Sequence, residues 1–395
     1  MTLSAIRCPL SVFRYPLALL LGTVAAASPG PPERNYFVFV ASEGVDRIQL
    51  IRFGPGGLTV ERAFRIGLVP TEPSGPHGLA VAPGGKSFFV STGHGAPYGS
   101  LWKFASADDK PQGRVQLGLF PATLQISPDG YLAYVVNFNL YGDMVPSSVS
   151  VVATDEMVEV ARIPTCIMPH GSRLNSQGTK HYSACMMDDM LVEIDTRKLA
   201  VSRHFFLRKG QERGMDGPVV ASTTSAGTSP ASHDIGGHGM TPPKPGDVSC
   251  SPTWAQPSAD GSKIYVACNK ASEIVEVDAA SWAISRRWPA GEGVYNLAVT
   301  HDGKLLIATN KRGQSVSIFD LAAGRELKRL PTKRKVVHGV AVSPDDRYAF
   351  VSVEGIGSQP GTVEVIDLRT RAAVASADVG QMAGGIDFWK TEGGH

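Results

Sequence analysis

The chain has 395 residues, of which 43% are hydrophobic and 19% charged, so it can bury a large core. Its formal net charge is only +2, which gives no reason to expect a nucleic acid or an acidic membrane surface as a partner. Glycine (43 residues) and proline (28 residues) are abundant, as is typical of a chain with many tight turns.

Residues 1–27 have the pattern of a secretory signal peptide. Arg7 and Arg14 supply a positive start, an apolar stretch follows, and Ala25–Ala27 offers small residues for cleavage. The apolar stretch is too short for a typical membrane-spanning helix, and no later stretch is long enough either. The alternative is an uncleaved anchor. We therefore expect a periplasmic or secreted protein with no membrane span after cleavage.

The rest of the chain repeats one pattern with a period of roughly 40 to 50 residues. Each copy has a short β run, a turn rich in Ser, Pro, Asp and Gly, a second β run, and two further runs. Four strands per period are typical of one blade of a β-propeller. The turns lie at residues 82–85, 127–130, 175–178, 258–261, 300–303 and 343–346.

Six copies are complete, and a seventh is divided between the two ends of the chain. Residues 37–44 resemble the second strand at residues 349–355, and residues 384–388 match a first strand. The sequence thus predicts an all-β fold, a seven-bladed β-propeller of four-stranded antiparallel blades. N- and C-terminal strands would share one blade and close the ring, which leaves no long open sheet edge. Residues 28–395 are expected to form this single domain.

One segment, residues 208–247, interrupts the period. It is rich in Gly, Ser, Thr and Pro, and it has no strand pattern. We expect a long loop insertion between the third and fourth blades, either a functional lid or a disordered segment.

The second strands carry a recognisable motif. It stands as Tyr134-Val135-Val136-Asn137 in one copy and as Tyr265-Val266-Ala267-Cys268 in another. This pattern resembles the YVTN family of β-propellers over nearly the whole mature chain. The resemblance implies the fold and says little about activity, since the family includes surface and periplasmic binding proteins as well as enzymes.

The first strands of a propeller line its central channel. When the seven copies are aligned on their turns, the residue that begins each first strand can be identified. Three of the seven are histidines followed by glycine, and they fall on blades 1, 3 and 6, close to threefold spacing. Three imidazoles around one axis are a ligand set for a transition metal such as copper or zinc. The seven residues are His77, Ala122, His170, Thr253, Tyr295, His338 and Gly384.

Further candidate ligands fall on the same face of the ring, in the loops before the first strands and after the second strands. His94, Met168 and Met186 lie in such loops, and His238 lies in the insertion. Imidazole with thioether favours copper over magnesium or calcium. The structural alternative is that each histidine caps a turn within the channel and that the methionines only pack.

Four cysteines follow the signal segment, and an even number in an exported protein indicates disulfides. Cys166 and Cys185 flank the first hairpin of blade 3, and Cys250 and Cys268 hold equivalent places in blade 4. Antiparallel pairing brings each pair together. The alternatives are thiolate ligation beside His170 and a swapped pairing of Cys185 with Cys250.

The first functional hypothesis is a copper-binding periplasmic propeller, possibly an oxidoreductase. The histidine arrangement is similar to that of the propellers of nitrous oxide reductase and thiocyanate dehydrogenase, which implies axial histidines around copper. This chain has fewer candidate histidines and no fused cupredoxin domain, so one or two ions are expected instead of a cluster. A small-molecule substrate or a redox partner protein would approach the channel mouth.

Two other functions stay open. One is a non-catalytic scaffold that binds a protein or a glycan, and the other is a lactonase-like hydrolase. No catalytic residue can be assigned, although Glu43 and Glu354 are candidates for a base. Arg173 and Arg312 are candidates for holding an anionic substrate.

Overall fold

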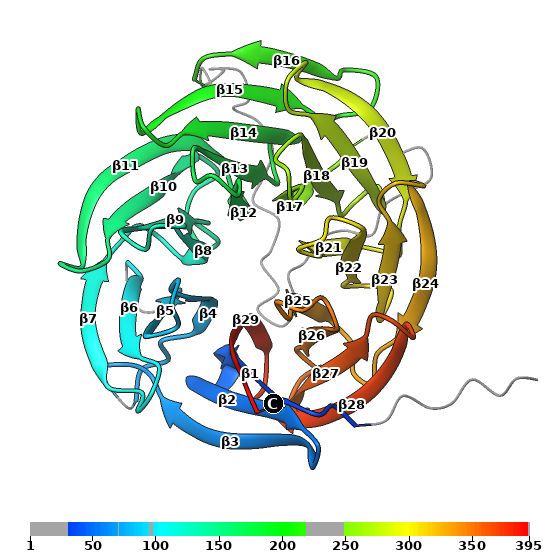
Figure 1. Cartoon of the computed structure of the whole chain (residues 1–395). Helices are drawn as coiled ribbons and strands as arrows, with labels where there is room; N and C mark the ends of the chain where they lie inside the picture. Colours follow the sequence, from blue (N-terminus) through cyan, green and yellow to red (C-terminus); the bar gives the residue numbers. More distant parts are fainter. Residues whose placement is uncertain (1–30, 70, 95–97, 219–248, 394–395) are drawn as a thin grey trace, which may run out of the picture. The chain divides into compact units, whose positions relative to one another are not determined.

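Seven antiparallel sheets surround a central channel in the computed structural model, which describes residues 31–69, 71–94, 98–218 and 249–393. The innermost strand of each sheet contacts the innermost strands of its two neighbours, so the sheets form a ring (Figure 1). This confirms the predicted seven-bladed propeller. In the described ranges the only helix is a short 3-10 turn, η1 (Glu43–Val45), and no helix is long and apolar enough to cross a membrane. The predicted signal peptide lies outside the described residues.

The strands of each blade follow one another from the channel outward. Blade 1 contains β4 (Pro76–Val81), β5 (Ser87–Thr92), β6 (Ser100–Ala105) and β7 (Pro111–Gln116), and blade 2 contains β8 (Pro121–Ile126), β9 (Leu132–Asn137), β10 (Pro146–Ala153) and β11 (Val158–Ile167). Blade 3 contains β12 (Pro169–Leu174), β13 (Lys180–Cys185), β14 (Met190–Asp195), β15 (Ala200–Phe206) and β16 (Arg213–Asp216). Blade 4 contains β17 (Pro252–Pro257), β18 (Lys263–Cys268), β19 (Glu273–Asp278) and β20 (Ala283–Pro289). Blade 5 contains β21 (Val294–Val299), β22 (Leu305–Asn310), β23 (Ser315–Asp320) and β24 (Arg325–Pro331). Blade 6 contains β25 (Val337–Val342), β26 (Tyr348–Val353), β27 (Gly361–Asp367) and β28 (Ala372–Val379), and blade 7 contains β29 (Ala383–Glu392), β1 (Asn35–Ser42), β2 (Arg47–Gly54) and β3 (Gly57–Arg65).

Blade 7 joins the two ends of the described chain, as the sequence predicts. Strand β29 pairs with β1 in antiparallel register, with Asp387 opposite Phe39 and Ile386 opposite Val40. The C-terminal strand thus occupies the channel position, and the N-terminal strands complete the sheet. Closure of this kind pairs edges that would otherwise be open.

The turn between the first and second strands explains why the repeat is so regular. In the turn at residues 127–130, the Ser127 hydroxyl donates to Asp129 Oδ1 at 2.5 Å and accepts the backbone N–H of Leu132 at 3.0 Å. Gly130 adopts a φ of 86°, a conformation that glycine tolerates without steric cost. Ser258 and Ser343 make the same pair of bonds in their own turns.

The core lies between adjacent blades, not within one sheet. Phe89 and Leu101 of blade 1, for example, pack against Leu124 and Val135 of blade 2, and all four side chains are buried. Burying each such side chain stabilises the fold by roughly 1.5 to 3 kcal/mol. Each blade depends in this way on its neighbours.

One expectation about the insertion is wrong. Residues 208–247 were expected to contain no strand, but β16 pairs with β15 and makes blade 3 five-stranded. All four residues of β16 are exposed. Its pairing uses backbone groups at an open outer edge, so it needs no alternating apolar pattern that the sequence could reveal. Residues 219–248 of the insertion lie outside the described residues.

Candidate functional site

In each blade, the second residue of the first strand is the first one to border the central channel. These are the positions that the repeat alignment singles out, and in Figure 1 the strands that carry them border the central channel. In most blades this second residue lies within a β-bulge, where the register between the first and second strands shifts. The residues are His77, Ala122, His170, Thr253, Tyr295, His338 and Gly384.

The three predicted histidines converge in the channel. The ring centroids of His77 and His338 lie 5.4 Å apart, and those of His77 and His170 lie 6.2 Å apart. Tyr295 completes the group, with its ring 5.2 Å from that of His170 and 4.9 Å from that of His338. All four side chains are buried. We call these four residues the channel ring.

His170 is a neutral imidazole whose proton position follows from its partners. Burial, together with the electrostatic effect of the neighbouring His77, lowers the pKa of His170 to about 3. Its Nδ1 lies 3.0 Å from the carbonyl oxygen of Thr253, which can only accept, so Nδ1 carries the proton. Nε2 then accepts a hydrogen bond from the Tyr295 hydroxyl at 2.9 Å. Burial and the charges of Glu354 and Glu43 raise the pKa of Tyr295 well above its usual value, so the hydroxyl keeps its proton.

Glu43 links the ring to the loop that follows β5. Its two carboxylate oxygens lie 2.7 Å from His77 Nδ1 and 2.7 Å from His94 Nε2. Burial acts to raise the pKa of Glu43, but the charges and hydrogen bonds of His77 and His94 outweigh it and hold that pKa well below its usual range. The hydrogen bond to Glu43 in turn raises the pKa of His94. Glu43 is thus an ionised, buried acceptor that orients His77.

A second charged pair lies beside His338. The Lys311 ammonium donates to Glu354 Oε1 at 2.9 Å, and that oxygen lies 3.8 Å from His338 Nε2. The ammonium also lies 4.3 Å from the centroid of the Tyr295 ring, within range of a cation–π interaction. The sequence analysis proposed Glu354 but missed Lys311. Both follow directly after the second strand of their blade, as Glu43 does, so the repeat alignment would have found Lys311 if applied at this position.

The two predicted methionine ligands lie in a hydrophobic cluster beside the ring. Met168 and Met186 are buried with Phe120, Ala122 and Phe138. Phe138 contacts His170 with ring centroids 4.8 Å apart, and Phe120 contacts His77 at 5.3 Å. In this arrangement the methionines support the wall behind the imidazoles. His94 reaches Glu43, and His238 lies outside the described residues.

Three imidazole nitrogens of the channel ring, His77 Nδ1 and both nitrogens of His170, are hydrogen-bonded to protein groups. Within the described residues, no group of three or more His, Cys, Asp or Glu side chains is placed as a metal-ligand set. The hydrogen bonds of His77 to Glu43 and of His170 to Thr253 and Tyr295 account for this. Metal binding at the ring would require the Tyr295 hydroxyl to release His170 Nε2.

A small cavity adjoins the ring inside the channel. Its volume is about 30 Å³, and His77 and His338 are among its lining residues. Sites for metabolite-sized ligands are about tenfold larger, at roughly 300 to 1,000 Å³. The cavity accepts water or an ion and excludes a sugar.

The predicted disulfides are confirmed. Cys166 bonds Cys185, and Cys250 bonds Cys268. Neither thiolate ligation beside His170 nor the swapped pairing is formed. Cys166 and Cys185 lie in the hydrophobic cluster between blades 2 and 3, and Cys250 and Cys268 lie in the one between blades 3 and 4. Disulfides are typical of proteins from oxidising compartments.

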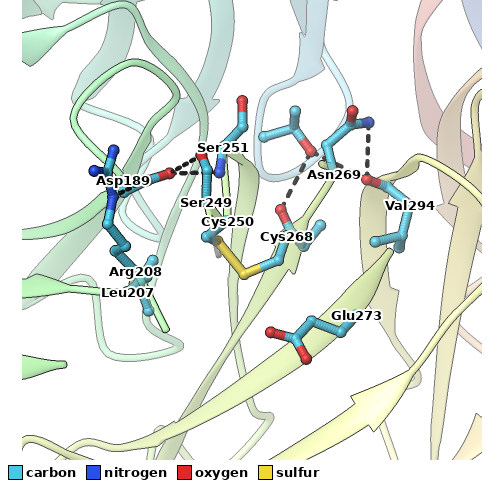
Figure 2. Close-up of a disulfide and its surroundings, with 12 residues drawn as sticks. Asp189, Leu207, Arg208, Ser249, Cys250, Ser251, Cys268, Asn269, Glu273 and Val294 are labelled. Carbon is cyan, nitrogen blue, oxygen red and sulfur yellow. Dashed lines mark hydrogen bonds and ion pairs between the residues drawn. A yellow bond between two sulfur atoms is a disulfide. The ribbon is translucent and has the colours of Figure 1, made fainter. Parts of the chain in front are cut away.

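Figure 2 shows how blade 3 is tied to the entry of blade 4 near Cys250–Cys268. Asp189 accepts hydrogen bonds from Ser249 Oγ at 2.8 Å and from the backbone of Ser251 at 2.7 Å, and it pairs with Arg208 at 2.9 Å. The two ends of the insertion, at Arg208 and Ser249, therefore meet at one buried carboxylate.

Comparison with known proteins supports the fold alone. No protein-family model and no curated protein matches the chain. Among solved structures, it is similar to hydrazine synthase of Kuenenia stuttgartiensis, with 19% identity, 80% of this chain and 90% of that chain covered, and a TM-score of 0.58. It is also similar to a periplasmic gluconolactonase of Pseudomonas aeruginosa, with 19% identity, coverage of 90% and 99%, and a TM-score of 0.61. A Desulfotomaculum acetoxidans protein of unknown function matches at 13% identity, coverage of 89% and 98%, and a TM-score of 0.63. The chain thus has the seven-bladed propeller architecture, consistent with the YVTN-type repeat of its sequence.

Proposed function

We propose that this protein is an exported propeller that binds a transition metal ion between His77, His170 and His338, and that copper is the preferred metal. The observation that carries the proposal is the approach of the three rings in the channel. A metal–nitrogen bond is about 2 Å long, so imidazoles at tetrahedral angles around one ion have ring centroids about 5 Å apart. The two distances that the His77 ring makes, 5.4 and 6.2 Å, are close to this value. Binding of one ion would also have to bring His170 and His338, both of which contact Tyr295, equally near each other.

The hydrogen bonds around the ring suit such a site. His77 and His170 both engage an acceptor through Nδ1, a carboxylate in one case and a backbone carbonyl in the other. Acceptors of this kind orient the Nε2 of metal-bound histidines. Copper is preferred because it binds imidazole nitrogen most strongly among the divalent first-row metals. A bound copper ion would supply a redox centre or a Lewis acid.

Metal stoichiometry tests the proposal. The mature protein would be treated with Cu(I) and separately with Cu(II), dialysed, and examined by elemental analysis. We expect near-stoichiometric copper in the wild type and its loss in the variant His77→Ala/His170→Ala/His338→Ala. A matched control is His301→Ala, which removes an exposed histidine in a turn of blade 5 and should keep the metal. Equal copper in the triple variant and the control would contradict the proposal.

Glu43 gives a sharper test of how the site is oriented. Glu43→Gln keeps an oxygen acceptor and removes the charge, so His77 should be held less firmly and be less basic. We expect copper affinity to fall by roughly 10- to 100-fold, as for other carboxylates behind a histidine ligand. Competition with a coloured chelator measures the affinity. Glu292→Gln, in an exposed loop after blade 4, is the control. An unchanged affinity in Glu43→Gln would exclude His77 as an oriented ligand.

A lactone hydrolase is the second candidate, and its support is the similarity in fold to a periplasmic gluconolactonase. The cavity of about 30 Å³ is too small to enclose such a substrate, so the reaction would have to occur at the mouth, near His94. Hydrolysis of glucono-1,5-lactone by chelator-treated protein, with loss in His94→Ala, would favour this candidate. If the protein shows neither metal binding nor hydrolysis, the remaining candidate is a scaffold that binds a protein or glycan.

A further inference from the structure

The cavity beside the channel ring has one charged wall that the metal proposal does not use. Arg173, on the first strand of blade 3, lines the cavity together with residues of the six other blades. Its guanidinium carbon lies 4.4 Å from the centroid of the Trp254 ring, so the side chain is held flat against the indole. The polar and aromatic side chains of the lining are His77, Thr123, Arg173, Trp254, Asn296 and His338.

The charge of Arg173 has no carboxylate to balance it. Its Nη1 donates to the carbonyl of Ser172 at 2.8 Å, and no ion pair joins it to a carboxylate in the described part of the chain. The acidic group that acts on it is Asp387 of blade 7, which instead accepts the backbone N–H groups of Val81 and Phe388 at 2.8 and 2.9 Å. Burial raises the pKa of Asp387, which weakens it further as a counter-charge.

Arg173 nevertheless stays a cation. Burial lowers the pKa of Arg173 to about 10, which is still far above neutral pH. Arg173 is only partly exposed, and a charge removed from water without a counter-charge is costly, so proteins normally compensate it with a counter-ion or a full set of hydrogen bonds. The guanidinium has five N–H donors, and one carbonyl satisfies only one of them.

Two neutral side chains of the lining also have unused hydrogen-bonding capacity. Asn296 is 4% exposed and Trp254 is 3% exposed. Among the residues described, Oδ1 of Asn296 and the indole Nε1 of Trp254 have no hydrogen-bond partner. Asn296 also carries two N–H donors, and the indole N–H can only donate. The lining therefore combines a cation with the indole N–H donor of Trp254 and with an amide, Asn296, that has both donors and an acceptor.

We propose that this cavity binds a small inorganic anion, either a halide or a short linear anion, with Arg173 as its principal contact. Size selects the class. One water needs roughly 10 to 15 Å³ of such space, so about 30 Å³ holds an ion of two or three atoms and excludes phosphate esters and sugar acids. Because His77 and His338 border the same cavity, an anion there would lie next to a metal held by the channel ring. The site itself rests on Arg173 and does not depend on that metal.

Bromide is the probe, and the sample is mature protein from which a chelator has removed any metal. The result therefore does not depend on whether the metal proposal is correct. Bromide would be titrated while tryptophan fluorescence is recorded, because Trp254 lies directly against Arg173. We expect saturable binding in the wild type and a loss of at least about tenfold in affinity in Arg173→Met, as expected for removal of a buried charge-assisted bond. Arg162→Met, which removes an exposed arginine bonded to Glu159 on the outer strand of blade 2, should bind as the wild type does.

Bromide anomalous diffraction keeps the proposal testable if Arg173→Met folds poorly. Crystals soaked in bromide should show a peak in contact with the Arg173 guanidinium, and Arg173→Lys should retain part of the affinity. An unchanged titration in a folded Arg173→Met variant, or the absence of a peak in the cavity of the wild type, would overturn the proposal.

Discussion

Replacing Cys250 and Cys268 by alanine is expected to lower the free energy of unfolding by about 3 kcal/mol, and replacing Cys166 and Cys185 as well should lower it by about 3 kcal/mol more. The bridges close loops with sequence separations of 18 and 19, for which the restriction of the unfolded chain gives this magnitude. Alanine is chosen because all four positions are buried and a serine hydroxyl would need a partner there.

Urea unfolding of the two double variants and the quadruple variant measures these losses. The two bridges lie in different core clusters, so their effects should be close to additive. Because each bridge restricts the unfolded chain, its removal should expand that chain and raise the denaturant slope. A quadruple variant within about 1 kcal/mol of the wild type would contradict the assigned role of the bridges.

Replacing His181 by leucine is expected to remove about 3 kcal/mol of the stability that the protein loses in acid, while His170, whose pKa is lowered equally, keeps its own share. His181 is fully buried on β13 and stacks on Tyr134, with ring centroids 5.3 Å apart. Burial, together with the charge of Arg173, lowers the pKa of His181 to about 3. Its usual value is about 6.5, so the unfolded chain takes up a proton as the pH falls through 6.5 while the folded chain does not. Stability from this group is therefore complete above pH 6.5 and is lost progressively toward pH 3.

The size of this effect follows from the shift. Between pH 7 and pH 4 the wild type should lose about 3 kcal/mol through His181 alone, and His181→Leu should not show this loss. At pH 7 the substitution should be nearly neutral, since neither ring nitrogen has a hydrogen-bond partner among the described residues. Urea unfolding at both pH values measures it. A variant that loses as much stability as the wild type on acidification would show that His181 is not held neutral.

The repeat made most of the fold predictable. Its turns and alternating strands fix seven copies, and the match between residues 37–44 and 349–355 shows which blade is divided. The disulfides followed from the same register, because in blades 3 and 4 alike one cysteine precedes the first strand and the other ends the second. Cys166 itself lies on β11, the outer strand of blade 2, so its bridge joins two blades. Strand β16 was missed because only backbone pairing at an edge creates it.

The candidate site was only partly predictable. The alignment placed His77, His170 and His338 at one level of the ring, where the structure also has them. It could not show that Tyr295 bonds His170 Nε2, because that contact depends on side-chain conformations across the channel. Nor could it show whether Met168 would turn toward the imidazoles or into the hydrophobic cluster, since both directions are open to a loop residue.

Anomalous diffraction at the copper absorption edge tests the central claim most directly. Crystals of the mature protein reconstituted with copper would be used, so the position of the ion is observed and not inferred from variants. The account predicts a single strong peak enclosed by the rings of His77, His170 and His338, with the Tyr295 hydroxyl displaced from His170. A peak elsewhere, or no peak after reconstitution, would contradict it.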